Sequence, residues 1–87
     1  FCPGSADALN ALGNAHYALL DYTLAESFYR KALLLNPEHA DVHNNLGNTL
    51  AKKNRLDEAA NCFKLGLKLD PKRPEFLTNL GSVLQAQ

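Results

Sequence analysis

Apolar positions recur along this chain with the spacing of amphipathic helices. In the first segment they fall at offsets of 0, 3, 4, 7 and 11 residues, which places them on one stripe of a helix: Leu9, Leu12, Gly13, His16 and Leu20. A break at Asp21-Tyr22 leads to a second helical pattern over residues 22–35, whose buried side is predicted to carry Leu24, Ala25, Phe28, Tyr29, Ala32 and Leu35. Asn36-Pro37 ends this helix, because proline lacks a backbone donor and disfavours helical geometry in the residue before it.

The same order of elements follows once in full and once in part. The pattern predicts helices over residues 40–53 and 56–69, separated by a turn at Asn54-Arg55 and closed by Asp70-Pro71. A fifth helix is predicted from Pro74 to about Ala86, because proline is well tolerated at the first helical position. The chain is therefore expected to be all-α, with five helices.

The pattern repeats with a fixed period of 34 residues. Leu-Gly pairs stand at 12–13, 46–47 and 80–81, and Ala25 recurs as Ala59 and Tyr29 as Phe63. Such a period is typical of stacked repeats, in which each unit buries its apolar face against its neighbours. The predicted units are residues 6–39, residues 40–73 and a partial third unit over 74–87, preceded by a tail over 1–5 that is native or left over from cloning.

Each repeat places a glycine in the middle of its first helix, at Gly13, Gly47 and Gly81. Glycine at such a position costs about 0.5 to 1 kcal/mol relative to alanine, so a packing gain must offset it. Ala25 and Ala59 in the second helices suggest that small residues allow the two helices of a unit to approach closely.

The 34-residue helix-turn-helix unit, with Leu-Gly in its first helix, Ala and Tyr or Phe in its second and Pro in the closing turn, resembles the tetratricopeptide repeat. The chain departs from that family's pattern where His16, Leu50 and Leu84 replace the usual aromatic residue and Gly66 replaces the usual alanine. The resemblance implies antiparallel helix-turn-helix repeats stacked as a short right-handed superhelix of about two and a half repeats. It also implies an adaptor or scaffold whose first helices line a concave groove for a peptide or a partner domain.

The first helices carry a polar face opposite their apolar stripe. Set side by side, they would form a row of acids (Asp7, Asp41, Glu75) and two rows of amides or hydroxyls (Asn10, Asn44, Thr78; Asn14, Asn48, Ser82). An asparagine both donates and accepts, so such rows could bind the backbone of an extended peptide. The alternative is a solvated face with acids favoured by the helix dipole. The predicted partner-binding residues are Asp7, Asn10, Asn14, Asp41, Asn44, Asn45, Asn48, Lys52, Glu75 and Asn79.

Two kinds of ligand-binding groove known in the family can be compared with these residues. Asn45 and Asn79, just before the Leu of the motif, are similar to the groove asparagines of O-linked N-acetylglucosamine transferases, although Ala11 breaks the series. The chain could then be a fragment of the repeat region of such a glycosyltransferase, without its catalytic part. The carboxylate clamp that holds acidic chaperone tails would require Lys at 10 and 75 and Arg at 79. Only Asn14 and Asn45 match it, and Glu75 would repel a terminal carboxylate.

No arrangement of residues indicates catalysis. His39 and His43 stand four apart, as two metal ligands on a helix would, but no third ligand is nearby, and His16 is expected to be a packing residue. No Ser-His, Cys-His or paired-carboxylate pattern is present, so we predict a protein that is not an enzyme and that has no cofactor or metal.

Composition limits the partners and the compartment. Nine basic and nine acidic residues cancel, which argues against binding to nucleic acid or to an anionic membrane. No apolar run approaches the about 20 residues of a membrane span, and no secretion signal is evident. Cys2 and Cys62 are not expected to pair, which favours the cytoplasm or another intracellular reducing compartment.

The last predicted helix carries more apolar residues than one preceding unit can bury. We expect Leu77, Leu80, Val83 and Leu84 to form an open end face. Exposed apolar patches commonly mark interaction surfaces. The alternative function is therefore a self-assembly module, with homo-oligomers formed through this face.

Overall fold

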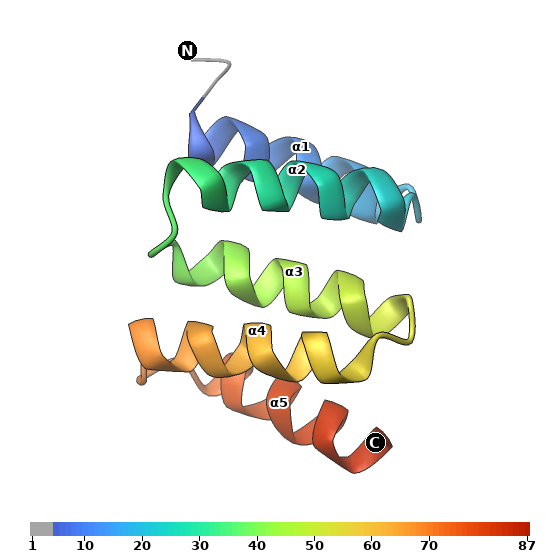
Figure 1. The fold of residues 1–87 in the computed structure, drawn as a ribbon, viewed down its shortest axis with the longest axis vertical. Coiled ribbons are helices and arrows are strands. Elements are labelled where there is room, and N and C mark those ends of the chain that lie inside the picture. Colours follow the sequence, from blue (N-terminus) through green and yellow to red (C-terminus); the bar gives the residue numbers. More distant parts are fainter. Residues whose placement is uncertain (1–4) are drawn as a thin grey trace.

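The computed structural model describes residues 5–87. The described chain contains five α-helices, which are α1 (Ala6–Ala18), α2 (Tyr22–Leu35), α3 (Ala40–Lys52), α4 (Leu56–Leu69) and α5 (Pro74–Ala86). Figure 1 shows them stacked one after another along the long axis of a 39 × 26 × 17 Å molecule. The predicted all-α class is confirmed. We call α1, α3 and α5 the A helices, and α2 and α4 the B helices.

The helix ends follow from local hydrogen bonds. Ser5 and Asp21 cap α1 and α2, with side-chain oxygens accepting from Ala8 N at 3.0 Å and Leu24 N at 3.2 Å. The turns that end α1 and α3 share one geometry, in which Leu20 and Asn54 adopt left-handed φ angles of 63° and 62°. Leu20 therefore lies in a turn, although the apolar pattern placed it on the helical stripe.

The core lies between the helix pairs. Its largest fully buried side chains are Tyr29, Phe63, Phe76, Leu46, Leu50, Val42 and Thr49. The first repeat is less covered than the second, since Leu46 is 2% exposed and the equivalent Leu12 is 42% exposed. The prediction that Leu24 and Leu35 lie on a buried side is wrong: both are exposed, as are the equivalent Glu58 and Leu69, so these positions face solvent in both repeats. Leu12 on the apolar stripe is exposed for another reason, because within residues 5–87 no helix precedes the α1–α2 pair on that side.

Aromatic rings, and not the small residues, explain the glycines of the first two A helices. A β-carbon built on Gly13 would lie 2.5 Å from Tyr29 Cε1, and one on Gly47 would lie 2.6 Å from Phe63 Cε1. These separations are too short for carbon atoms that are not bonded, so any side chain at either position would displace a buried ring. Ala25 and Ala59 are fully buried in the same helix pairs, but they are not the nearest neighbours of the glycines.

Candidate peptide-binding groove

The three A helices bring the predicted polar rows together. α1 contacts α3, and α3 contacts α5. The bonds between them join positions one residue out of equivalence, residue 10 to residue 45 and residue 44 to residue 79, and not the members of one predicted row. Asn45 Nδ2 donates to Asn10 Oδ1 at 2.9 Å and to Asn14 Oδ1 at 3.3 Å. One repeat later, Asn79 Nδ2 donates to Asn44 Oδ1 at 2.8 Å. The two amide pairs, Asn10–Asn45 and Asn44–Asn79, form the same link at successive repeats.

Each amide pair is joined by the amide nitrogen of one asparagine and the carbonyl oxygen of the other. An asparagine side chain offers two donor hydrogens and one acceptor oxygen. Among the residues that the structure describes, the Nδ2 groups of Asn10 and Asn44 and the Oδ1 atoms of Asn45 and Asn79 bond no other protein group. Each pair therefore presents one donor and one acceptor to a ligand.

The third polar row differs between the repeats. Tyr29 OH donates to Asn14 Oδ1 at 2.6 Å, which fixes the Asn14 side chain. Burial, together with nearby Tyr17, raises the pKa of Tyr29 to about 12, so this hydroxyl remains a donor at neutral pH. Phe63 takes the place of Tyr29 in the second repeat, and Asn48 has no such donor within the described chain.

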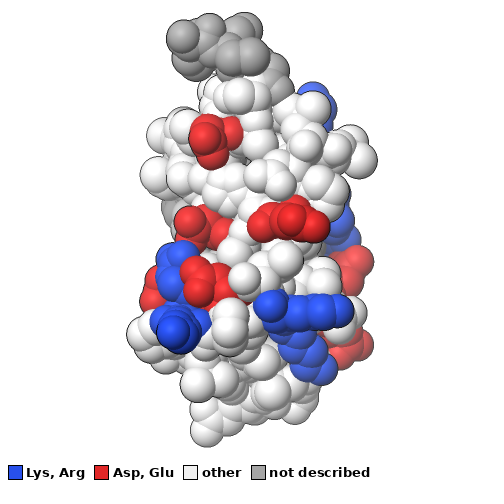
Figure 2. All heavy atoms as spheres, turned by 90° about the vertical axis from the view of Figure 1, so that its left-hand side faces the viewer, with Lys and Arg blue, Asp and Glu red and all other residues white. Residues whose placement is uncertain are grey.

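The acidic row is engaged by basic groups of the inter-repeat turns. Asp7 Oδ1 lies 3.1 Å from His39 Nε2, and the equivalent Asp41 lies 2.7 Å from Arg73 Nη2. Arg73 also pairs with Glu75 at 2.6 Å. Figure 2 views the stack from the side on which the turns between repeats lie, and acidic and basic side chains intermingle there. Asp7 and Asp41 thus hold the residue that precedes the next A helix, and Glu75 bonds Arg73 of the second repeat. These links were not evident from the positions of the acids in the first turns of helices.

On this side of the stack, Arg73 forms ion pairs with three acids, Asp41, Asp70 and Glu75. Hydrogen bonds to Glu75 and Asp41 raise its pKa above the ordinary value of arginine. The guanidinium carbon also lies 4.4 Å from the centre of the buried Phe76 ring. Lys52, the cation that the sequence placed in the groove, is exposed in the last turn of α3.

Glu26 on α2 joins the first and second repeats on the opposite side of the stack, beside the turns within each repeat. The sequence interpretation did not identify this residue. Its Oε1 accepts from Lys53 Nζ and Arg55 Nη1, both at 2.8 Å, and its Oε2 accepts from Arg30 Nε at 2.8 Å. Burial alone would raise the pKa of Glu26, but the hydrogen bonds from Lys53 and Arg30 outweigh it and hold the pKa below the ordinary value. Only the Glu26–Arg30 pair, four residues apart, could be recognised from sequence.

The histidines have structural contacts. His43 Nε2 donates to Pro37 O at 2.8 Å, while His39 contacts Asp7 on another helix. Within residues 5–87 no group of three or more His, Cys, Asp or Glu side chains is placed to hold a metal ion. His16 stacks on Phe28 with ring centres 5.3 Å apart, which confirms its packing role.

Cys62 is a buried thiol of α4. Burial raises its pKa to about 11, so it stays protonated and poorly nucleophilic at neutral pH. Cys2 and most of the predicted tail lie outside the described residues. Nor does any helix of the described part combine the length and the apolar character that crossing a bilayer would need.

The end face of α5 is smaller than predicted. Leu77 and Leu84 are 62% and 47% exposed, as expected for an open face. Val83 is only 5% exposed and belongs to the core, and Leu80 packs against that core. Placing Val83 on the open face was therefore wrong, because α4 covers one side of α5 and leaves another bare. Self-association through Leu77 and Leu84 stays a prediction.

Comparison with known protein families agrees with the repeat geometry. A family model described as the tetratricopeptide repeat matches residues 10–74. The chain belongs to the tetratricopeptide repeat family. This confirms the family resemblance drawn from the Leu-Gly, Ala, aromatic and Pro positions.

A curated relative and several solved structures are similar to this chain. Protein SULFUR DEFICIENCY-INDUCED 2 of Arabidopsis thaliana is 47% identical over 51 residues, which cover 59% of this chain and 16% of that protein. The crystal structure of MamA superposes with a TM-score of 0.93 at 21% identity, over 98% of this chain and 50% of MamA. The first TPR of Spaghetti (RPAP3), bound to the HSP90 peptide SRMEEVD, has a TM-score of 0.93 at 24% identity, over 97% of this chain and 67% of its own. The chain thus spans a small part of the plant relative and half of MamA, and the structural similarities show the fold.

Proposed function

We propose that the chain is a protein-interaction module whose A helices bind an extended segment of a partner protein. The observation that carries this proposal is the recurrence of the amide pair one repeat apart, each with a donor and an acceptor left over. Neighbouring packed helices lie about 8 to 10 Å apart, which is close to the length of three residues of an extended chain. Successive amide pairs would then bind peptide units about three residues apart.

The chemistry of the groove favours a neutral or basic segment over an acidic one. Spaghetti binds an HSP90 peptide with two glutamates and an aspartate near its end. In this chain, Asn10, Glu75 and Asn79 stand where the family's carboxylate clamp has cations, and Glu75 is already paired with Arg73. We do not propose an acidic C-terminal tail as the ligand.

A narrower version of the proposal concerns the origin of the groove. In this version the chain is a piece of the repeat region of an O-linked N-acetylglucosamine transferase, with Asn45 and Asn79 as groove asparagines and with Ala11 departing from the series. Backbone recognition by amides depends little on the ligand's side chains, which suits a module that accepts many sequences. No catalytic role is proposed for this chain, and an intracellular reducing compartment remains a prediction.

Asn44→Asp tests the proposal with little change to the fold. Aspartate keeps an oxygen to accept from Asn79 Nδ2, but it replaces the outward donor of Asn44 by an acceptor. Peptides selected from a random library on the wild-type chain should bind Asn44→Asp about tenfold more weakly. The matched control is Asn61→Asp, which adds the same charge on the exposed side of α4. Equal binding by all three proteins, or equal loss in both variants, would overturn the proposal.

A further inference from the structure

The outer sides of the B helices carry leucine and lysine at exchanged positions. Leu34 of α2 and Lys68 of α4 occupy the same position in successive repeats, and so do Lys31 and Leu65. Leu34 is 82% exposed and Leu65 is 46% exposed. A single exposed leucine is ordinary in a folded protein. Here each helix has a leucine where the other has a lysine, so the leucines depend on place in the stack and not on place in the repeat.

The leucine of α2 lines a pocket on the side of that helix that is turned toward α4. The pocket has a volume of about 380 Å³ and is lined by Arg30, Leu33 and Leu34. Arg30, one turn before Leu34, donates to Glu26, and Glu26 also accepts from Arg55 at the start of α4. This side of α2 therefore faces the second repeat.

The leucine of α4 is turned toward the same space. Leu65 follows Glu58 by two helical turns, and Glu58 bonds the Arg55 side chain that also bonds Glu26. Because α2 and α4 run in the same direction (Figure 1), Leu34 and Leu65 both lie about two turns beyond this ionic link. The two helices each pack on α3 and not on one another, which leaves both leucines uncovered. We call Leu33, Leu34 and Leu65 the outer patch.

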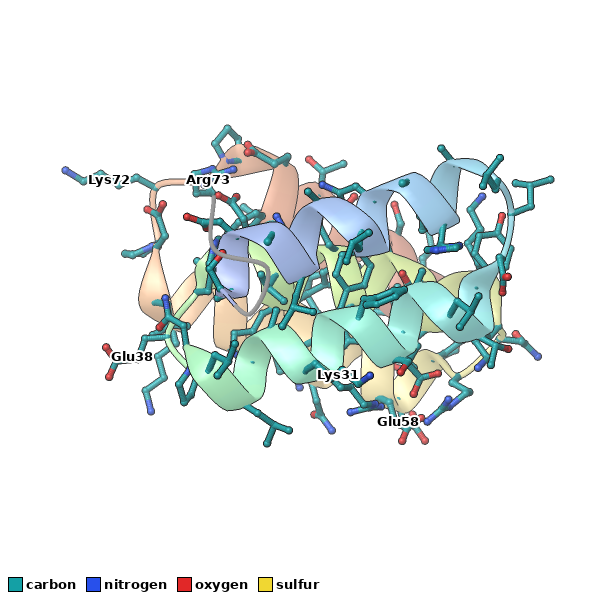
Figure 3. The ribbon with its side chains drawn as sticks, turned by 90° about the horizontal axis from the view of Figure 1, so that it is seen from above. Lys31, Glu38, Glu58, Lys72 and Arg73 are labelled. Carbon is teal, nitrogen blue, oxygen red and sulfur yellow. The ribbon has the colours of Figure 1, made fainter. Side chains whose placement is uncertain are left out.

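Positive charge borders the outer patch. Lys31 is one turn from Leu34, and Lys68 is one turn from Leu65. Within residues 5–87 neither lysine forms an ion pair. Glu58, an acid on the same side of α4 as Leu65, is already paired with Arg55. Figure 3 shows Lys31 and Glu58 on the side of the stack that is turned away from α1.

We propose that the outer patch binds an acidic amphipathic helix of another protein. Apolar side chains of that helix enter the pocket beside Leu34 and contact Leu65, and carboxylates on its flanks pair with Lys31 and Lys68. An amphipathic helix that lays its apolar face on an apolar surface is a common mode of protein recognition. The exchanged leucines and lysines supply both the apolar contact and the complementary charge.

Neither further repeats nor a second copy of the outer patch would fill this surface. Repeats added to a stack extend it at its ends and do not enter the space between α2 and α4. A second copy that used the same patch would bring Lys31 and Lys68 against lysines of its own kind, which repel. The patch is also separate from the amide pairs, which lie on the A helices.

A designed peptide is the probe for the outer patch. It is a labelled helical peptide with leucine on one face and glutamate on the other, and its binding to the whole chain is measured by fluorescence anisotropy. Leu34→Gln and Leu65→Gln should each weaken binding about tenfold. Leu77→Gln is the matched control, because Leu77 is an exposed leucine of α5, and it should bind as the wild type does. Circular dichroism should show that these surface variants are folded.

The charge requirement is tested separately. The same peptide with lysine in place of glutamate should bind at least about tenfold more weakly. At low salt, the double variant Lys31→Gln and Lys68→Gln should weaken binding of the glutamate peptide about three- to tenfold. Lys52→Gln, which removes an exposed lysine of α3, and Asn44→Asp, which alters the amide pairs, should both leave binding unchanged.

Several results would overturn the proposal. It is wrong if the glutamate peptide does not bind, if the lysine peptide binds equally well, or if Leu34→Gln and Leu65→Gln have no effect. An equal loss in Leu77→Gln would place the peptide elsewhere and has the same meaning. Two other occupants have their own signatures: a dimer in sedimentation that Leu34→Gln dissociates would indicate a second copy. Binding to phosphatidylserine vesicles that Leu34→Gln abolishes, without binding of the peptide, would indicate a membrane surface.

Discussion

The ring of Phe63 lies directly over Gly47, with its Cε1 atom 2.6 Å from where a β-carbon of residue 47 would be. Gly47→Ala therefore forces a buried ring to move. We expect it to lower the free energy of unfolding by about 1 to 3 kcal/mol, the usual cost of overpacking a core. Urea unfolding followed by circular dichroism measures this loss.

The same substitution at Gly81 should have the opposite effect. Gly81 is mid-helix with open space beside it, so Gly81→Ala removes the entropic cost of glycine without a clash. It should raise the free energy of unfolding by about 0.5 to 1 kcal/mol. Two changes of the same sign would show that ring contact does not explain the glycine at position 47.

Leu20 is a second position at which the sequence is not optimal for its conformation. It has a φ angle of 63° and is 71% exposed, whereas Asn54 occupies the equivalent turn position with a φ angle of 62°. Left-handed geometry costs a leucine about 1 kcal/mol, and asparagine tolerates it better. We expect Leu20→Asn to raise the midpoint of thermal unfolding.

The neighbouring Leu19 provides the control for that prediction. It is also exposed, but its φ angle is −84°. Leu19→Asn should leave the midpoint nearly unchanged. An equal gain from both substitutions would mean that removing an exposed leucine, and not relieving φ, causes the stabilisation.

Glu26→Gln tests the ionic link between the repeats. Three basic side chains bond Glu26, so at neutral pH the variant should lose about 1 to 3 kcal/mol of the free energy of unfolding. The pKa of Glu26 is lowered in the folded chain, so its stabilising contribution exists above the ordinary value of 4.5. The contribution disappears as the pH falls through the lower folded pKa.

The difference in stability between wild type and Glu26→Gln should accordingly shrink under acid conditions. Urea unfolding at a series of pH values below neutrality would show this trend. Glu58→Gln removes an exposed partner of Arg55 only, and it should cost far less. A difference that does not change with pH would contradict the ionic origin of the effect.

Tyr29→Phe separates a hydrogen bond from a ring contact. The variant keeps the ring over Gly13 but loses the 2.6 Å bond to Asn14, so at neutral pH it should lose about 0.5 to 1.5 kcal/mol. The pKa of Tyr29 is raised from 10.0 to about 12, and the resulting stabilisation is fully present below pH 10 and is lost as the pH rises through 12. Over that interval the wild type should lose more stability than Tyr29→Phe, which unfolding curves at alkaline pH would measure.

Helix positions could be predicted from sequence because their signals are local. Apolar spacing, Pro37 and Pro71 located four of the five helices to within one residue at each end, and the first helix was misjudged only near Leu20. Burial was harder to predict, because it depends on place in the stack as well as on place in the repeat. Leu12 and Leu46 are the same repeat position, yet within residues 5–87 only Leu46 has a preceding B helix to cover it.

The candidate site could be predicted in part. The polar rows were evident from helical periodicity, but the pairing of Asn45 with Asn10 depends on the distance between two helices that are not adjacent in sequence. Glu26 was missed for the same reason, since two of its three partners, Lys53 and Arg55, lie in another repeat. A sequence read one helix at a time does not show such contacts.

The charged links between repeats have a mechanical consequence. Charged groups join the first and second repeats at Glu26, near the turn between α1 and α2, and Arg73, near the turn between α4 and α5, bonds both Asp41 of α3 and Glu75 of α5. Figure 3 shows Arg73 and Glu58, which shares Arg55 with Glu26, on opposite sides of the stack. Gln87 Nε2 also donates to Asp57 Oδ1 at the start of α4, so α5 is held at both of its ends. Tension along the long axis is thus resisted at both edges of the stack.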